Sequence, residues 1–142
     1  MLAAAARRAE RENTGLTLLA ITVLTSLDSA DLLATGITSS PAEHALRLAR
    51  LAKDNGIPGM VCSALEVGAL RDALGPDSVL VTPGIRPQAG GGDDQKRTGT
   101  PAGAIRAGAS LLVVGRPIRD AADPGAAALA ISDEIQRASA LA

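Results

Sequence analysis

Four short runs of apolar and β-branched residues, each followed by a segment of helical character, constrain the fold of this chain more than any other feature. The first run, from Leu16 to Leu24, is continuous, as expected for a parallel strand that is buried on both faces. Strands that alternate with helices favour right-handed crossovers and therefore an α/β fold with a parallel sheet. The predicted strands span residues 16–24, 59–62, 78–82 and 111–114.

Capping residues indicate where the helices begin. Ser40 stands before Pro41 and three residues before Glu43, a spacing that predicts a capping box, and Gly56 predicts the end of that helix. The leading segment is rich in Ala, Arg and Glu, which are strong helix formers. The other candidate caps are Ser63, Thr100 and Asp123, and the predicted helices span residues 1–13, 41–55, 64–74, 101–107 and 124–138.

Two architectures fit this order of elements: a small doubly wound sheet, and part of a (β/α)8 barrel. A whole barrel needs about 250 residues, whereas this chain has 142, which suits a single partial-barrel domain over residues 1–142. Four parallel strands without further partners leave two open edges and an uncovered apolar face. We therefore expect the chain to associate with itself or with a complementary half-barrel, or to be part of a longer protein.

The composition excludes several classes of function. Lys and Arg number 14 against 15 Asp and Glu, so the net charge of −1 gives no electrostatic reason to expect nucleic acid or a lipid surface as a partner. The absence of Phe, Tyr and Trp removes base-stacking platforms and membrane-interface anchors. No apolar run reaches the roughly 18 residues of a membrane span. The single cysteine excludes a disulfide framework, which fits a cytoplasmic protein.

Candidate functional residues follow the last two predicted strands. Gly84 and Arg86 come after the third strand, and Gly115 and Arg116 come after the fourth. In barrels, the loops after the last two strands commonly form a phosphate site, where glycine lets backbone N–H groups approach the anion and arginine binds its oxygens bidentately. Gln95, in the long polar loop over residues 86–100, adds an amide donor. Alternatively, the glycines only permit tight turns and the arginines are solvated.

Three motifs at these positions resemble a known family. They are AITVLTSLDSADL from Ala20, VTPGIRPQ with DDQKR and TP between Val81 and Pro101, and LLVVGRPI from Leu111. With them, residues 16–137 resemble the C-terminal half of bacterial orotidine 5′-phosphate decarboxylase. The resemblance implies half of a TIM-type (β/α)8 barrel. It also implies a cofactor-independent lyase that converts orotidine 5′-phosphate (OMP) to uridine monophosphate (UMP) and CO2 in pyrimidine biosynthesis.

The resemblance also implies roles for individual residues. Arg116 and the Gly115 backbone would hold the 5′-phosphate of the nucleotide, and Gln95 would reach the same group or the pyrimidine from the loop. Gly90 to Gly92 would let this phosphate-gripping loop fold over the ligand, so that binding energy from the phosphate is used at the reacting centre. The implied substrate-binding set is Thr25, Arg86, Gln95, Gly115 and Arg116.

The family's catalytic motif is missing from this sequence. In the family, an Asp-x-Lys-x-x-Asp motif supplies the lysine that is understood to protonate the carbon losing CO2, and no such motif occurs here. Lys53 is predicted on a helix surface and Lys96 in the loop, so neither is placed as a general acid, which must lie within about 3 Å of its target. We expect a chain that binds nucleotide without a catalytic residue of its own. A non-catalytic phosphate- or nucleotide-binding fragment is the alternative.

The other chemically reactive side chains are interpreted as structural. Cys62 ends a buried strand and is expected to be an inert small hydrophobe. His44 has no cysteine or carboxylate at ligand spacing, so a surface role is expected rather than a metal site. Asp93-Asp94, beside Lys96-Arg97, is expected to be part of a solvated, charge-balanced loop. We predict neither a metal nor a cofactor.

Overall fold

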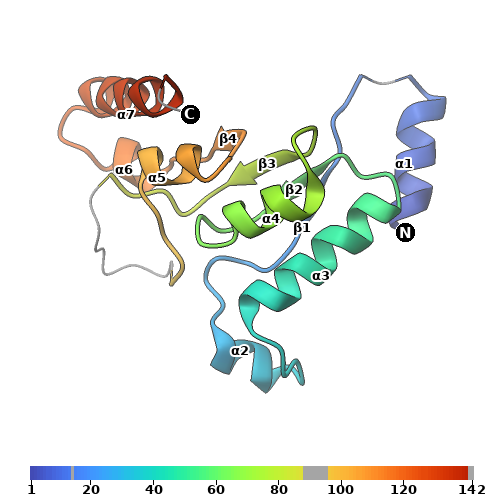
Figure 1. The fold of residues 1–142 in the computed structure, drawn as a ribbon. Helices are drawn as coiled ribbons and strands as arrows, with labels where there is room; N and C mark the ends of the chain where they lie inside the picture. The colour runs from blue at the N-terminus through green and yellow to red at the C-terminus, as the bar shows by residue number, and fades with distance from the viewer. Residues whose placement is uncertain (14, 88–95, 141–142) are drawn as a thin grey trace.

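The structure is a computed structural model that describes residues 1–13, 15–87 and 96–140 (Figure 1). Four strands form one parallel sheet in the order β1-β2-β3-β4. The strands are β1 (Leu19–Ile21), β2 (Gly59–Val61), β3 (Val79–Thr82) and β4 (Leu111–Leu112). The helices are α1 (Leu2–Arg11), α2 (Ser29–Ala34), α3 (Pro41–Asp54), α4 (Val67–Leu74), α5 (Pro101–Arg106), α6 (Arg116–Arg119) and α7 (Pro124–Ser139).

Local capping determines where the longer helices begin. At α3, the backbone N–H of Ser40 donates to the Glu43 carboxylate at 2.9 Å, and the Glu43 N–H donates back to the Ser40 hydroxyl at 3.3 Å. Thr100 and Asp123 cap α5 and α7, and each is followed by proline at the first helical position. The predicted starts of these three helices are confirmed.

One face of the sheet is covered by α3 and α4. Ala20, Met60 and Leu80 occupy equivalent positions on neighbouring strands, and Met60 and Leu80 are fully buried beneath these two helices. The core is aliphatic apart from the thiol of one cysteine, as a chain without aromatic residues requires. The buried core residues here are Ala49, Ala52, Ile57, Met60, Cys62, Val67, Leu70, Leu74 and Leu80.

The opposite face of the sheet, called the inner face below, is apolar, buried at Gly59 and Val81 on the central strands and exposed along the edge strands. Its residues on the two edge strands are about half exposed: Leu19 by 43%, Ile21 by 57% and Leu111 by 58%. Within the described ranges, neither packed apolar cluster includes a side chain of this face. Helices on one face only, together with sequential strand order, identify a barrel-type sheet rather than a doubly wound one. The inner face comprises Leu19, Ile21, Gly59, Val61, Val79, Val81, Leu111 and Val113.

The first strand differs from its prediction. Only Leu19–Ile21 of the apolar run at residues 16–24 forms a strand, and both of its end residues are exposed. The prediction that this run is buried on both faces is wrong, because its inner side has no covering layer in this chain.

Two short helices were not predicted, and one predicted helix begins later than expected. Residues 29–34 form α2 behind a capping box between Asp28 and Asp31, and residues 116–119 form α6 directly after Gly115. The helix predicted to begin after Ser63 starts instead at Val67, because residues 63–66 form a turn.

At the C-terminal end of the described chain, α7 packs against α5 and α6 (Figure 1). None of the described helices is long and apolar enough to cross a membrane.

Candidate functional site

The predicted site residues lie just beyond the carboxyl ends of three strands. Thr25 is four residues past β1, Arg86 is four residues past β3, and Gly115 with Arg116 follows β4. Because parallel strands end at the same edge of a sheet, all three segments leave the sheet on one side. Thr25 is buried, Arg86 and Arg116 are half-buried, and Gly115 is exposed as the N-cap of α6.

A paired stem closes the base of the loop over residues 86–100. Ile85 and Gly99 form a parallel bridge, in which the Arg86 N–H donates to the Gly99 carbonyl at 2.8 Å and the Gly99 N–H donates to the Gly84 carbonyl at 3.2 Å. Gly84 has a φ of 74°, which favours glycine at this turn. The stem holds Arg86 at the mouth of the loop. Two predictions within the loop, Gln95 and the run Gly90–Gly92, lie outside the described residues.

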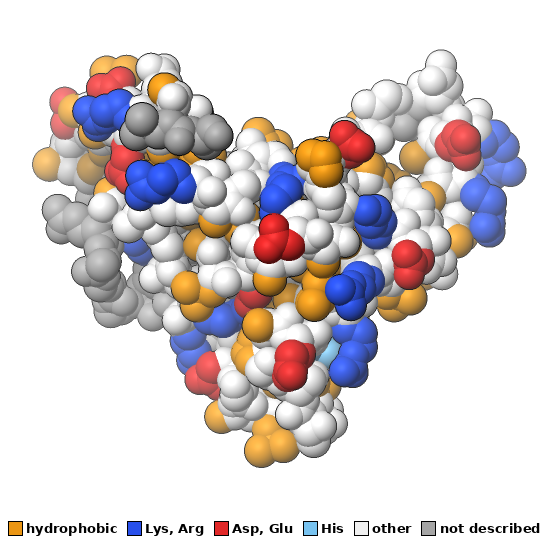
Figure 2. Space-filling view, viewed as in Figure 1, with side chains coloured by type: hydrophobic (Ala, Val, Ile, Leu, Met, Phe, Trp, Pro, Cys, Tyr) orange, Lys and Arg blue, Asp and Glu red, His pale blue; other side chains and the backbone are white. Residues whose placement is uncertain are grey.

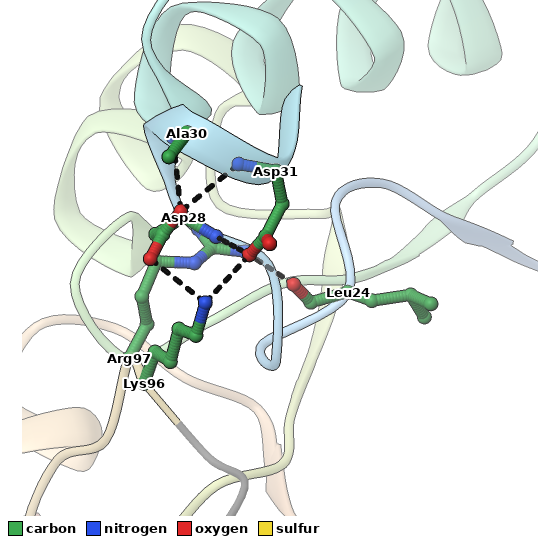
Figure 3. Close-up of polar contacts among 6 residues, drawn as sticks. All are labelled: Leu24, Asp28, Ala30, Asp31, Lys96 and Arg97. Carbon is green, nitrogen blue, oxygen red and sulfur yellow. Dashed lines mark hydrogen bonds and ion pairs between the residues drawn. The ribbon is translucent and has the colours of Figure 1, made fainter. Parts of the chain in front are cut away.

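The returning side of the loop is attached to the segment after β1. The backbone N–H groups of Lys96 and Arg97 both donate to the Thr25 carbonyl, each at 3.2 Å. The Lys96 ammonium contacts Asp28 at 2.8 Å and Asp31 at 2.7 Å (Figure 3). The hydrogen bond from Lys96 lowers the pKa of Asp28 to about 2, and the two carboxylates raise the pKa of Lys96. The structure therefore brings Thr25 and the end of the loop together.

Arg97 is buried, with 7% of its surface exposed. One guanidinium nitrogen, Nη2, donates to the carbonyl oxygens of Val23 at 3.0 Å and Leu24 at 2.9 Å. The other, Nη1, forms an ion pair with Glu66 and lies 3.4 Å from the Ser63 hydroxyl. Burial lowers the pKa of Arg97. The prediction of a solvated, charge-balanced loop is wrong for Arg97, because the guanidinium connects three segments beneath the surface.

Other predicted residues are placed away from these contacts. Cys62 is buried on the helix-covered side, and burial raises the pKa of its thiol to about 11. His44 is half-buried in the first turn of α3. The Lys53 ammonium donates to the Leu74 carbonyl at the end of α4. Asp93 and Asp94 lie outside the described residues, and in the part of the chain that is described no group of three His, Cys, Asp or Glu side chains could hold a metal ion.

The polar residues that attach the loop were not predicted from the sequence. Asp28 and Asp31 carried a detectable signal, since an aspartate followed three residues later by another acidic side chain is a helix-capping pattern. Asp28 accepts from the N–H groups of Ala30 and Asp31 (Figure 3). The pairing of Arg97 with Glu66 joins residues 31 positions apart in the chain, and no local pattern predicts it.

Comparisons with known proteins agree with the resemblance. The family model described as orotidine 5′-phosphate decarboxylase / HUMPS family matches residues 1–131. Orotidine 5′-phosphate decarboxylase of Chromohalobacter salexigens is 50% identical over 135 residues, which are 95% of this chain and 57% of the relative. The enzyme of the same name from Methylobacterium sp. is 54% identical over 136 residues, which are 94% of this chain and 58% of the relative.

A solved structure shows the same fold. The crystal structure of orotidine 5′-phosphate decarboxylase from Lactobacillus acidophilus superposes with a TM-score of 0.68 at 42% identity, covering 84% of this chain and 49% of that one. This chain thus spans about half the length of these relatives, between 49% and 58%. The resemblance and the barrel-type α/β fold are confirmed, and the chain belongs to the orotidine 5′-phosphate decarboxylase / HUMPS family.

Proposed function

We propose that this chain is the C-terminal, phosphate- and nucleotide-binding half of an orotidine 5′-phosphate decarboxylase, acting in the cytoplasm. It binds the 5′-phosphate of OMP or UMP and lacks the lysine and aspartates that perform decarboxylation in the family. Turnover then requires a complementary half-barrel that carries them. The family membership and the position of the candidate residues at one edge of the sheet support this proposal.

The observation that carries the proposal is the attachment of the loop to the segment after β1. The Thr25 carbonyl accepts from both Lys96 and Arg97, so the returning side of the loop is held beside Thr25. The paired stem holds the departing side beside Arg86. Both ends of the loop are therefore fixed at the carboxyl edge of the sheet, where it can close over a ligand bound there.

In this proposal each residue of the predicted set has a distinct role. The Arg116 guanidinium pairs with the phosphate oxygens, and the Gly115 backbone lies against the same group because it has no side chain to obstruct the approach. Arg86 adds a second positive charge from the loop's stem. Gln95 reaches the phosphate or the pyrimidine from the loop, and Thr25 lines the nucleotide's side of the site.

The positions of the two lysines support the proposal that this chain has no proton donor for decarboxylation. Lys53 is on α3 and donates to the Leu74 carbonyl, which lies ahead of the start of β3 and so at the amino end of the strands. Lys96 lies near the carboxyl edge, but two carboxylates hold its ammonium and raise its pKa. Lys96 therefore serves to attach the loop in this proposal, because both carboxylates already engage its ammonium.

A non-catalytic nucleotide-binding module that self-associates is the second candidate function. The uncovered inner face favours it, because a chain with half-exposed apolar strands gains stability from a partner. The two candidates predict the same nucleotide binding, and they differ in whether a complementary half restores turnover and in whether the chain associates with itself.

Calorimetric titration with UMP tests the binding proposal. We expect saturable one-site binding that Arg116→Ala weakens by about 10- to 150-fold, since a charge-assisted hydrogen bond contributes about 1.5–3 kcal/mol. Arg119→Ala is the matched control, because Arg119 is on the same short helix and pairs with Asp120. Equal affinity of Arg116→Ala and the unmodified chain would contradict the phosphate assignment.

A decarboxylation assay with OMP tests the second half of the proposal. The chain alone is expected to show no turnover, and activity is expected when a half carrying the Asp-x-Lys-x-x-Asp motif is added. Turnover by the isolated chain would show that a proton donor exists within it. Because the chain has no Trp or Tyr, the ultraviolet absorbance of the nucleotide is followed without interference from protein aromatic side chains.

A further inference from the structure

Two charged side chains lie inside the molecule and not on its surface. On the face drawn in Figure 2, the side chains of Lys, Arg, Asp and Glu are interspersed over the surface. Among the described residues, Arg97 and Glu66 are the two charged side chains that are buried. Burial of two charges is unfavourable unless their geometry is good and further hydrogen bonds satisfy them. The contacts of this pair therefore indicate what its burial is used for.

Glu66 connects the pair to the sheet. Its carboxylate accepts from the N–H of Ser63 at 2.9 Å, and Ser63 lies two residues past β2. The Glu66 N–H donates back to the Ser63 carbonyl at 3.1 Å, which closes the turn. Ser63 is fully buried, and the N–H of the adjacent Cys62 donates to the carbonyl of Val81 in β3 at 3.1 Å. The Glu66 carboxylate is thus held in place relative to the two central strands.

Arg97 extends this fixed point to the segment after β1. Its Nη2 donates to the carbonyl oxygens of Val23 at 3.0 Å and Leu24 at 2.9 Å (Figure 3). Its backbone N–H donates to the Thr25 carbonyl at 3.2 Å. Three successive carbonyl groups therefore point toward one residue. Because the described peptide bonds are trans, the N–H group that follows each carbonyl points away from Arg97. The direction of the peptide groups around Thr25 thus depends on Arg97.

We propose that Arg97 is a positioning residue for the nucleotide. With Glu66 as its anchor, it orients the backbone at residues 23–25 and so places Thr25 against the ligand. This inference rests on the proposed function, in which Thr25 lines the nucleotide's side of the site. Arg97 acts through Thr25 and does not contact the ligand, because it is buried and Glu66 balances its charge. It therefore affects the geometry of the nucleotide's side and not the attraction of the phosphate.

Arg71 provides a matched comparison at the opposite end of the strands. Its guanidinium donates to the carbonyl oxygens of Gly75 at 2.8 Å, Ser78 at 2.8 Å and Gly108 at 2.7 Å. These carbonyl groups lie ahead of β3 and β4, at the amino edge of the sheet. Each of the two arginines therefore holds several backbone carbonyl groups together. Arg97 does so beside the candidate site, and Arg71 does so away from it.

The variants Arg97→Lys and Arg71→Lys separate a positioning role from a structural one. Lysine keeps the positive charge, but its ammonium cannot reproduce the fixed planar array of donors in a guanidinium. Arg97→Lys is preferred to Arg97→Met because it retains a cation for Glu66. Urea unfolding is expected to show a loss of stability in both lysine variants. Calorimetric titrations with UMP and with inorganic phosphate then give two affinities for each chain.

We expect the two ligands to respond differently to Arg97→Lys. Its affinity for UMP is expected to fall about 5- to 10-fold, the effect of about one misplaced neutral hydrogen bond, and its affinity for phosphate to change by less than about 2-fold. The amide NMR signals of Thr25 and Ser26 are expected to shift in this variant, while those of Gly115 and Arg116 stay in place. Arg71→Lys is expected to leave both affinities within about 2-fold of the unmodified chain, since distant sites act independently.

Two results would overturn the inference and leave the proposed function standing. One is a change in Arg97→Lys that is the same for UMP and phosphate, including no change in either. The other is an equal loss of UMP affinity in the two lysine variants, which would assign the effect to stability alone. If the unmodified chain binds neither ligand, the inference and the proposed function both fail.

The unmodified chain decides if Arg97→Lys does not fold. The guanidinium NMR signals of Arg97 are then expected to shift when UMP is added and to stay in place with inorganic phosphate. Those of Arg71 are expected to shift with neither ligand. Arg97 signals that UMP leaves unchanged would overturn the inference.

Discussion

Arg97 and Glu66 form a buried ion pair that joins the end of the 86–100 loop to the beginning of α4. The same guanidinium donates to the carbonyl oxygens that follow β1. Three segments that are distant in the sequence therefore share one side chain at the carboxyl edge of the sheet. Lys96, the preceding residue, attaches the loop to α2 through Asp28 and Asp31.

Replacing Arg97 is expected to destabilise the fold strongly. Arg97→Met leaves the Glu66 carboxylate buried and unpaired, which costs about 3–5 kcal/mol of unfolding free energy. Urea unfolding followed by far-UV circular dichroism measures the loss. Arg119→Met is the control, because its pair with Asp120 is exposed to solvent and is expected to contribute little to stability. Similar small losses in both variants would contradict the structural role of Arg97.

The contact between Lys96 and Asp28 predicts that the folding stability of the chain falls at strongly acidic pH. The folded pKa of Asp28 is about 2, below its ordinary value of 3.8, so the unfolded chain binds the proton more readily. The stabilisation is therefore complete above about pH 4 and is lost as the pH falls towards 2. An NMR titration of the Asp28 carboxyl carbon measures this pKa.

Lys96→Met is expected to return the Asp28 pKa towards 3.8, because the hydrogen bond from Lys96 is the largest cause of the shift. Lys53→Met removes the same charge from α3 and serves as the control. A titration midpoint near 3.8 in the unmodified chain would show that the two side chains do not pair in solution.

Elements set by local chemistry were predicted well from the sequence. The capping box of Ser40 and Glu43 and the proline-initiated starts of α5 and α7 depend on neighbouring residues only. The extent of β1 was overestimated, because strand length depends on the partner strand and not on the apolar run alone. The choice between a barrel and a doubly wound sheet also required the strand order.

The candidate site was predictable only in part. Gly115, Arg116 and Arg86 stand beside strand ends in the sequence, and the structure places them there. Their roles in binding stay predictions. The burial of Arg97 was not predictable, since its partners at Val23, Leu24 and Glu66 come from two distant segments.

The close packing of the loop's stem predicts a binding defect in a glycine variant. A Cβ on Gly99 would collide with the Cβ of Ala64, so Gly99→Ala displaces the stem that holds Arg86. We expect UMP affinity to fall about 10-fold or more, as one charge-assisted contact is lost. Gly68→Ala, where a Cβ meets nothing within 4 Å, is the control and should stabilise α4 by about 0.5–1 kcal/mol. Unchanged UMP affinity in Gly99→Ala would show that the position of the stem does not affect binding.

Cys62 is expected to be unreactive in the folded chain. Its thiol is 1% exposed, and burial raises its pKa from 9.0 to about 11. Two pKa units reduce the thiolate fraction at pH 8 by about 100-fold, and burial blocks access as well. A colorimetric thiol assay should therefore show reaction only after unfolding in denaturant. Rapid reaction of the native chain would mean that the helix-covered core opens readily.

The central claim, that the carboxyl edge of this sheet binds a nucleotide phosphate, is tested most directly by backbone amide NMR during a titration with UMP. Saturable shifts are expected at Thr25, Arg86, Gly115 and Arg116, with inorganic phosphate reproducing those at Gly115 and Arg116. Shifts confined to α1 and α3, or none at millimolar UMP, would contradict it.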